Sequence, residues 1–271
     1  MERQSDKVMI ITGASSGIGQ ALAEEALKSG YRVAMAARNH EAMRKWVGQL
    51  GLSENRYLIV QTDVTREADC ERFIKEAVNR FGRIDVLVNN AGISMRALFA
   101  DLDLKVVERL MQVNFWGMVY CTHYALPHLL QSRGGVVGVS SIAGYKGLPG
   151  RSAYSASKFA MHGFLEALRI ENLNKGLHVL IACPGFTASN IRKTALAADG
   201  SQQGESPRSE DKMMQADEVA RQLLSAIRKR KHRLVLTRQG KLTVCLNKWF
   251  PKLVDKLVFN HMAKEPGSPL V

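Results

Sequence analysis

A tyrosine and a lysine one helical turn apart are the residues of this chain best suited to proton transfer. Tyr154 precedes Lys158 by four positions in "SAYSASKFAMHG" (152–163), which otherwise reads as a helix, so both side chains share one helix face. A free tyrosine has a pKa of about 10 and is a poor base at neutral pH. An ammonium ~4 Å away contributes about 4 kcal/mol at an effective dielectric constant of about 20, which equals roughly three pKa units. The spacing therefore predicts a phenol that exchanges protons near neutral pH.

A glycine-rich turn near the N-terminus predicts a dinucleotide site. The stretch "ITGASSGIGQAL" (11–22) follows a buried apolar run and opens a helical segment, with glycines in the spacing GxxxGxG. Glycine takes positive φ at little cost and lets a diphosphate approach backbone amides, and the N–H groups of the helix start point at the anion. The alternative is a tight turn that binds nothing, but the position after the first strand favours the dinucleotide. The residues expected to bind it are Gly13, Ser15, Ser16, Gly17, Ile18 and Gly19.

The end of the second strand favours NADP over NAD. A carboxylate there would bond the adenosine ribose hydroxyls of NAD, but Ala36 and Ala37 offer none and Arg38 follows. A guanidinium matches a 2′-phosphate in geometry and charge. The alternative is an exposed arginine without a ligand. Further contacts are expected at the ends of the third strand, near the adenine, and of the fourth strand: Asp63, Val64, Asn89, Asn90, Ala91 and Gly92.

The elements that must position these residues alternate between apolar and amphipathic segments. This alternation predicts a mainly parallel sheet with helices on both faces. Strands are expected at 7–12, 31–37, 57–63, 84–92, 135–141, 178–185 and 233–237. Helices are expected at 17–29, 40–50 and 66–80, from Asp103 past Tyr120, around Tyr154, and at 216–227 with Asp217 as a cap. We therefore predict an α/β, Rossmann-type, doubly wound domain over 1–237 with a mainly seven-stranded sheet, followed by a C-terminal extension over 238–271.

Taken together, these residues resemble the short-chain dehydrogenase/reductase family over about residues 6–237. The motifs that carry the resemblance are TGxxxGIG at 12–19, NNAG at 89–92, Asn114, a serine 13 residues before the tyrosine, YxxxK at 154–158, and Pro184-Gly185. The arginine after the second strand and the basic extension look most like the branch that contains 11β-hydroxysteroid dehydrogenase type 1. The resemblance implies an NADP-dependent enzyme that interconverts a ketone and a secondary alcohol, assembled as a homodimer or homotetramer.

The resemblance also implies roles for the catalytic group. Tyr154 delivers a proton to the carbonyl oxygen while NADPH delivers hydride to the carbon, and Lys158 also binds the nicotinamide ribose hydroxyls. Ser141 hydrogen-bonds the substrate oxygen; its neighbour Ser140 is the alternative, although the 13-residue spacing favours Ser141. Asn114 holds a water that connects Lys158 to the bulk proton supply, unless it is a plain buried polar residue of its helix.

One departure from the family leaves the nicotinamide end open. The family often has a threonine four positions after the glycine of Pro184-Gly185, where this chain has Ser189, with Thr187 two positions earlier. Either hydroxyl remains a candidate for contact with the cofactor.

The predicted substrate pocket is mostly apolar. It is expected to include residues after Gly92, residues between the catalytic serine and tyrosine, and the segment after the Pro-Gly pair: Ile93, Ser94, Met95, Ala143, Tyr145, Leu148 and Phe186. We expect a hydrophobic ketone or alcohol that is lipid-like, sterol-like or a bulky aromatic. The polar stretch 195–211 reads as a mobile insertion that orders as a lid when ligand binds.

The positive charge of the chain is concentrated in its last third. The net charge is +13, and residues 221–264 hold twelve Lys/Arg against the single acidic residue Asp255. Lysines alternate there with Trp, Phe, Leu and Val, which is typical of a helix that lies on an anionic membrane surface. Packing of the same apolar face on its own domain or on a second subunit is the other interpretation, and the one we favour. No nucleic-acid-reading motif accompanies the charge, so we do not expect nucleic-acid binding.

The sequence predicts no metal site, no paired cysteines, no transmembrane helix and no signal peptide. His123 and His128 have no partner ligands at metal-binding spacing, so no metal site is predicted. The four cysteines form no CxxC pair, which indicates free thiols in a reducing cytosol. The chain has no run of 18 apolar residues, and its N-terminus lacks the pattern of a signal peptide. We expect a cytoplasmic protein, either free or peripheral at a membrane surface.

Two functions follow from these features. The first is an NADP-dependent carbonyl reductase or alcohol dehydrogenase, and the second is a non-catalytic NADP-binding protein that regulates a partner or acts at a membrane surface. The joint presence of Ser141, Tyr154 and Lys158 favours the enzyme, since a binding protein has no need of all three.

Overall fold

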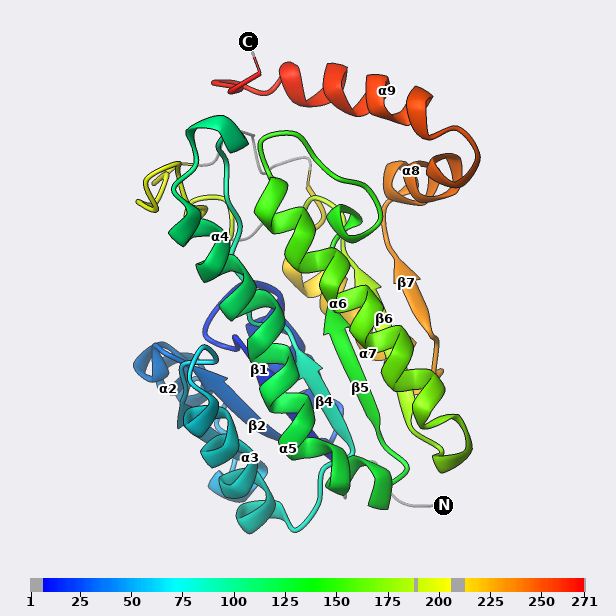
Figure 1. Ribbon diagram of the computed structural model, residues 1–271. Coiled ribbons are helices and arrows are strands. Elements are labelled where there is room, and N and C mark those ends of the chain that lie inside the picture. Colours follow the sequence, from blue (N-terminus) through cyan, green and yellow to red (C-terminus); the bar gives the residue numbers. More distant parts are fainter. Residues whose placement is uncertain (1–6, 188–189, 206–212, 271) are drawn as a thin grey trace.

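A seven-stranded parallel sheet forms the centre of the computed structural model, which describes residues 7–187, 190–205 and 213–270 (Figure 1). The strand order is β3-β2-β1-β4-β5-β6-β7, which is the doubly wound arrangement predicted from the sequence. The strands are β1 (Val8–Thr12), β2 (Arg32–Ala37), β3 (Tyr57–Gln61), β4 (Val86–Asn89), β5 (Gly135–Val139), β6 (His178–Cys183) and β7 (Arg233–Val235). The chain reverses its direction of winding between β1 and β4, so the carboxyl ends of these strands flank a crevice.

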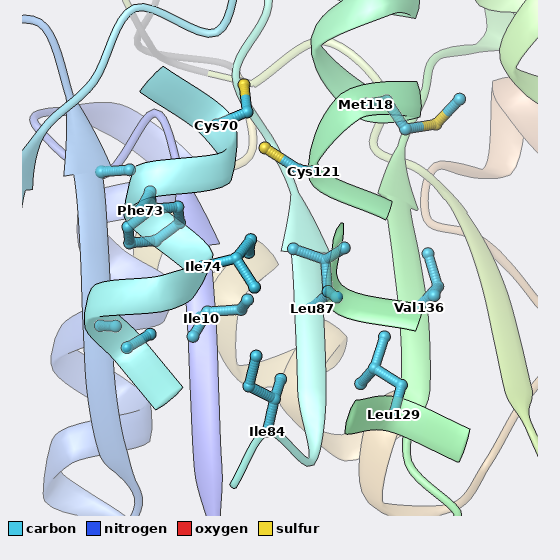
Figure 2. Packing of buried hydrophobic residues seen from close by; sticks show 14 of the residues in the cluster. Ile10, Cys70, Phe73, Ile74, Ile84, Leu87, Met118, Cys121, Leu129 and Val136 are labelled. Carbon is cyan, nitrogen blue, oxygen red and sulfur yellow. The ribbon is translucent and has the colours of Figure 1, made fainter. Parts of the chain in front are cut away.

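Helices cover both faces of the sheet because the side chains of each strand alternate between them. Ile10 of β1 belongs to the apolar cluster under α3, α5 and α6, whereas its neighbour Ile11 belongs to the cluster under α1, α2 and α7. The covering helices are α1 (Gly17–Lys28), α2 (His40–Gly48), α3 (Glu67–Phe81), α5 (Gly117–Gln131), α6 (Ser152–Glu171) and α7 (Ala216–Arg228). Figure 2 shows the first cluster, with Phe73 and Ile74 of α3 beside Ile10 and Leu87.

The predicted elements agree with the observed ones to within about three residues, with two differences in detail. The long helix after Asp103 is divided into α4 (Leu104–Met111), one π-helical turn (Gln112–Trp116) and α5. Asp217 does not cap α7: the N-cap is Gln215, and the Asp217 carboxylate instead pairs with Arg221 at 2.8 Å. The π turn matters for function because it contains Asn114, and such turns are frequent at functional sites.

The C-terminal extension forms two helices beyond the carboxyl ends of the strands. These are α8 (Arg238–Trp249) and α9 (Pro251–Ala263), drawn in orange and red in Figure 1. Buried Glu265, just after α9, lies 3.2 Å from the guanidinium of Arg151, and Lys146 pairs with Asp255 of α9 at 2.5 Å. The sequence left open what the extension packs on; one face of it packs on its own domain.

Candidate active site

A cavity of about 1640 Å³ opens at the carboxyl ends of the strands. Small-molecule sites in proteins usually occupy about 300–1,000 Å³, so this cavity has room for a dinucleotide and a second molecule. Its wall includes most of the residues predicted for the nucleotide, namely Gly13, Ser15, Ser16, Gly17, Ile18, Arg38, Asp63, Val64, Asn90, Ala91 and Gly92. It also includes the predicted catalytic residues Ser141, Tyr154 and Lys158, and the predicted nicotinamide-end residues Pro184, Gly185 and Thr187.

The glycine-rich loop has the backbone that an anion site requires. Gly13 and Gly17 have φ of +68° and +56°, a region that other residues rarely adopt. A side chain at Gly13 would also come within 2.8 Å of Ala91. The Ser16 side chain does not cap α1, and the first turn of α1 has no acidic residue, so its N–H groups and positive helix end face the cavity uncompensated.

Contacts of Gly19 and Asn90 hold the glycine-rich loop in its conformation. A Cβ at Gly19 would overlap the carbonyl oxygen of Gly13, so this glycine allows a close backbone approach within the protein and does not itself line the cavity. The Asn90 amide donates to the carbonyl oxygens of Thr12 and Gly13, at 3.0 and 3.1 Å. The Asn89 amide is directed elsewhere, to Thr122 at 3.1 Å. The end of β4 thus holds the loop in shape.

At the end of the cavity predicted to hold the adenosine, Arg38 is exposed while the nearby carboxylates have partners. Glu41 lies 2.9 Å from the His40 ring and 3.8 Å from Arg44. The Asp63 carboxylate accepts from both the backbone N–H and the hydroxyl of Thr65, at 3.0 and 2.8 Å. Val64, beside Asp63, adds an apolar surface to the wall.

Helix α6, which holds the predicted catalytic residues Tyr154 and Lys158, is attached to the end of β5 through three consecutive residues. Lys158 donates from Nζ to the carbonyl oxygen of Val139 at 2.9 Å. The Ser140 hydroxyl and Nε2 of His162 lie 2.7 Å apart, and the Ser141 hydroxyl lies near enough to Tyr154 to lower the pKa of the phenol. Residues 154, 158 and 162 repeat every four positions, so one face of α6 meets three successive residues of the strand end. Ser141 is therefore the serine that meets Tyr154, whereas Ser140 turns to His162.

The predicted lowering of the Tyr154 pKa is not found in the protein itself. Burial raises the pKa of Tyr154, and the hydrogen bond with Ser141 and the charge of Arg151 oppose that rise only in part. Lys158 adds little for two reasons: its Nζ lies 5.7 Å from the centre of the Tyr154 ring, and burial lowers the pKa of Lys158 to about 8. Residue spacing alone does not reveal the cost of placing both groups in a nonpolar setting.

Asn114 lies behind the catalytic pair and does not itself line the cavity. Its side-chain oxygen accepts from the Ile93 N–H at 2.8 Å, and its amide donates to the Ile93 carbonyl at 3.0 Å and to Ser157 at 2.9 Å. A Cβ at Gly92 would lie 3.2 Å from that oxygen and 3.6 Å from Nζ of Lys158. Gly92 therefore keeps a small space open between Asn114 and Lys158.

The substrate end differs in part from the prediction. Ile93, Ser94, Leu148 and Phe186 line the cavity as expected. Met95, Ala143 and Tyr145 do not: Met95 and Ala143 are fully buried, and the Tyr145 ring packs against His162 at 4.5 Å. Local sequence cannot tell which side of a loop faces the cavity, and these three side chains face the core. The remaining cofactor candidate, Ser189, lies outside the described residues.

The segment after β7 and the C-terminal extension supply cavity wall that was not predicted from the sequence. Thr237, the N-cap of α8, packs so closely on Gly185 that a side chain at position 185 would overlap it. Leu246 of α8 and Val258 and Met262 of α9 complete an apolar side of the cavity. Thr237 could have been found, because it follows the last strand and all these strands end at the same edge of the sheet. No pattern in the sequence predicted that Leu246, Val258 and Met262 would line the cavity.

The predicted lid is packed where the structure describes it. Ala195 and Leu196 are buried, and the Leu196 N–H and carbonyl pair with the backbone of Ser94 and Arg96 at 2.9 and 2.8 Å. The first part of the 195–211 stretch is therefore an ordered piece of the cavity wall, unlike the loose insertion that its polarity suggested. The stretch 206–211 lies outside the described residues.

Three further features concern metal binding, membrane-spanning helices and the state of the cysteines. Among the described residues, no three or more His, Cys, Asp and Glu side chains gather as a metal site would require. In that same part of the chain, no helix has both the length and the apolar character needed to cross a bilayer. All four cysteines are free thiols, and Cys245 alone among them is exposed.

Proteins of similar sequence belong to the family that the motifs of this site indicate. Residues 7–200 match the family model of the short-chain dehydrogenases. The chain is 40% identical over 200 residues to 11-beta-hydroxysteroid dehydrogenase-like 4A of Arabidopsis thaliana, an alignment that covers 73% of this chain and 67% of that protein. It is 42% identical to 11-beta-hydroxysteroid dehydrogenase A of Arachis hypogaea, over 71% of this chain but 55% of that protein. A Dictyostelium discoideum protein named dehydrogenase/reductase SDR family protein 7-like is 32% identical over 93% of this chain and 80% of its own length.

Solved structures share the fold at lower identity. A short-chain dehydrogenase/reductase of Burkholderia phymatum in complex with NAD superposes with a TM-score of 0.82 at 24% identity, covering 93% of this chain and 96% of that one. An alcohol dehydrogenase of Thermococcus sibiricus complexed with 5-hydroxy-NADP gives a TM-score of 0.74, also at 24% identity, over 84% and 93% of the two chains. With the family motifs at the carboxyl edge of this sheet and the family model matching most of the chain, the protein belongs to the short-chain dehydrogenases.

Proposed function

We propose that this protein is an NADP(H)-dependent oxidoreductase that interconverts a ketone and a secondary alcohol on a hydrophobic substrate, with Tyr154 as the general acid and base. The observation that carries the proposal is the catalytic face of α6. It brings Tyr154, beside Ser141, and the buried Lys158 to a cavity with a glycine-rich anion site at one end and an apolar wall at the other.

The residues of the chain suit the reductive direction at neutral pH. Because burial raises the pKa of Tyr154, the phenol stays protonated and can donate its proton to the oxygen of a ketone. The Ser141 hydroxyl, which already meets the phenol, orients the same oxygen. The positive charge of Arg151, which lowers the pKa of Tyr154, favours the phenolate that remains after proton transfer. When bound, the nicotinamide supplies the hydride for reduction and accepts it in the reverse reaction.

Proton resupply is assigned to the space between Asn114 and Lys158. Gly92 leaves that space open, and both groups border it with polar atoms. A water held there would be within reach of the lysine ammonium, which is the role that the family resemblance implied for Asn114.

The preference for NADP rests on Arg38. Its exposed guanidinium lies at the cavity end where Glu41 and Asp63 already have partners, which leaves the arginine as the group best placed to meet a 2′-phosphate. One structural neighbour was solved with NAD and another with 5-hydroxy-NADP, so the fold is compatible with either cofactor.

An apolar substrate fits the wall that the extension builds. The curated plant relatives are named as hydroxysteroid dehydrogenases, and a sterol-like or lipid-like ketone is our proposal for this chain as well. Ile93, Leu148 and Phe186 would contact it on one side, and α8 and α9 on the other.

The outer face of the extension supports peripheral contact of a cytoplasmic protein with an anionic membrane. Trp249 is 77% exposed and Phe250 57%, beside the exposed lysines Lys248 and Lys252. Aromatic and basic side chains together are the composition of interfacial helices. A lipophilic substrate could then reach a cavity whose wall is the inner face of the same helices.

A second exposed aromatic group supports assembly with another copy of the chain. Trp116 and Phe159 are 41% and 46% exposed on neighbouring helices, and the ring of Phe115 contacts both Trp116 and Phe164. Burial of such a patch favours a homodimer or homotetramer.

The test is oxidation of NADPH by the purified chain with ketones of increasing size: acetone, cyclohexanone, acetophenone, 2-decanone and progesterone. We expect turnover that rises with the apolar area of the ketone, with the corresponding alcohol as product. A protein that binds NADPH but turns over no ketone or alcohol in either direction would support the alternative, a non-catalytic regulator.

A further inference from the structure

His162 lies on the catalytic face of α6 one turn beyond Lys158, and no part of the mechanism above uses it. It is largely buried, and its Nε2 lies 2.7 Å from the hydroxyl of Ser140, the residue between the two strand-end residues that hold Lys158 and Tyr154. The imidazole is thus the third of three side-chain contacts between α6 and the end of β5.

The packing around the imidazole leaves it one position. The edge of the Tyr145 ring lies against it with centroids 4.5 Å apart, and Sγ of Cys183 in β6 is 3.9 Å from Nε2. A Cβ at Gly144 would lie 2.6 Å from Nε2 and 2.9 Å from the Ser140 hydroxyl. The absence of a side chain at Gly144 is therefore what allows the serine and the histidine to meet.

The surroundings also keep the imidazole neutral. Burial lowers the pKa of His162 to about 4, and the positive charges of Lys158 on its own helix and Arg233 on β7 act in the same direction. The other titratable neighbours are themselves uncharged at neutral pH, because burial raises the pKa of Cys183 and of Tyr145 to about 12. A neutral imidazole next to Lys158 leaves the ammonium without a second positive charge on the same face.

We propose that His162 is a positioning residue of the active site: through its hydrogen bond with Ser140 it fixes the end of β5 so that the neighbouring Ser141 hydroxyl meets Tyr154. The inference deepens the function proposed above and rests on it for the meaning of Ser141, but the geometry that it describes exists in the protein alone. A backbone shift at Ser140 moves Ser141 directly, because the two residues share a peptide bond. Loss of either partner should therefore weaken the contact between Ser141 and Tyr154.

The first test needs no substrate. The ionisation of Tyr154 can be followed from tyrosinate absorbance near 295 nm as the difference between each protein and its Tyr154→Phe counterpart. The hydrogen bond with Ser141 lowers the pKa of Tyr154, so its loss should move the midpoint to higher pH in His162→Leu and in Ser140→Ala. His162→Gln, which can still hydrogen-bond Ser140, should restore the wild-type midpoint, and the exposed His123→Gln should not move it.

The second test uses turnover of the best ketone of the panel with NADPH. We expect His162→Leu and Ser140→Ala each to lower kcat by about tenfold, the loss of about one hydrogen bond, with KM for NADPH unchanged. The double variant should lose no more than either single variant, because both remove the same contact. Rescue by His162→Gln separates positioning from a general loss of folding.

The outcomes separate this inference from the proposed function. If Tyr154→Phe abolishes turnover while His162→Leu matches the wild type in both tests, the role of His162 is refuted and the oxidoreductase stands. If Tyr154→Phe retains turnover, the proposed function fails, and the tyrosinate titration still decides whether His162 controls the contact of Ser141 with Tyr154.

Discussion

The catalytic face of α6 and the C-terminal extension both carry lysines and aromatic side chains, but they place them in opposite settings. Lys158 is 3% exposed and bonded to the carbonyl of Val139, whereas Lys248 and Lys252 project into solvent. Tyr154 lies beside Ser141 inside the cavity, whereas most of the Trp249 side chain is exposed to solvent. A buried ion must be held by fixed partners, while an exposed one is screened and free to meet a partner outside the molecule.

We expect the two regions to serve different steps of the proposed function. The α6 face has a geometry fixed by three contacts with one strand end, which suits chemistry that depends on position. The extension fixes only its inner face, through Glu265 and the apolar side chains on the cavity, and leaves the outer face for contact with a surface.

The largest effect is expected from Lys158→Met, which should abolish turnover and yet stabilise the fold. The pKa of Lys158 is lowered from 10.5 to about 8, so the unfolded chain binds more protons between those values, and stability rises with pH across that window. At pH 7 the buried charge costs up to about 3 kcal/mol, at 1.36 kcal/mol per pKa unit. Urea unfolding should show the gain, with the exposed Lys175→Met as control. A destabilised or still active variant would remove the contrast between the buried and the exposed lysines.

The second predicted effect is a loss of folding stability at acid pH. The pKa of His162 falls from 6.5 in the unfolded chain to about 4 in the fold, so stability should decline as pH falls from about 6.5 to 4, by up to about 3 kcal/mol. His162→Gln cannot be protonated and should lack this part of the decline. The measurement is urea unfolding of both proteins at several pH values, and parallel curves would show that the imidazole is not held neutral.

Nucleotide choice should depend on Arg38. Removing a charged hydrogen-bond partner of a phosphate typically costs about 2 kcal/mol, so Arg38→Ala should weaken NADPH about thirtyfold and leave NADH nearly unchanged. Fluorescence titration of both nucleotides measures this, with Arg44→Ala on the following helix α2 as the control. Unchanged NADPH affinity, together with tighter NADH binding by the wild type, would reverse the cofactor assignment.

The smallest effect is expected on the outer face of the extension. Each lysine near an anionic bilayer contributes about 1 kcal/mol, so Lys252→Gln should weaken binding to vesicles of phosphatidylglycerol and phosphatidylcholine about fivefold. Turnover of a small soluble ketone should stay the same. Vesicle sedimentation measures the affinity, and the exposed Lys175→Gln is the control. If the wild-type protein does not sediment with these vesicles, the outer face has another partner or none.

The same contrast explains which features could be predicted from the sequence. The sheet, its helices and the residues of the glycine-rich loop follow from local patterns, because apolar periodicity and glycine positions act over a few residues. Tyr154, Lys158 and Ser141 were predictable through the family motifs. His162 continues the four-residue spacing and could have been added to the face by the same argument.

Other features depend on packing that no local pattern contains. The direction of the Tyr154 pKa depends on burial from several elements at once, and a pairwise estimate between tyrosine and lysine gave the opposite sign. Met95 and Tyr145 face the core because neighbouring helices enclose them. The extension reads as amphipathic in sequence, but the sequence does not show that its inner face closes the cavity.

The most direct test of the account is the rate of ketone reduction by Tyr154→Phe, measured together with NADPH affinity and with Tyr124→Phe as the matched control. The account predicts a fall in kcat of about a thousandfold or more, within the usual range for general acid catalysis together with substrate orientation, and an NADPH Kd within about threefold of the wild type. Turnover by Tyr154→Phe within about threefold of the wild type would contradict the role of Tyr154.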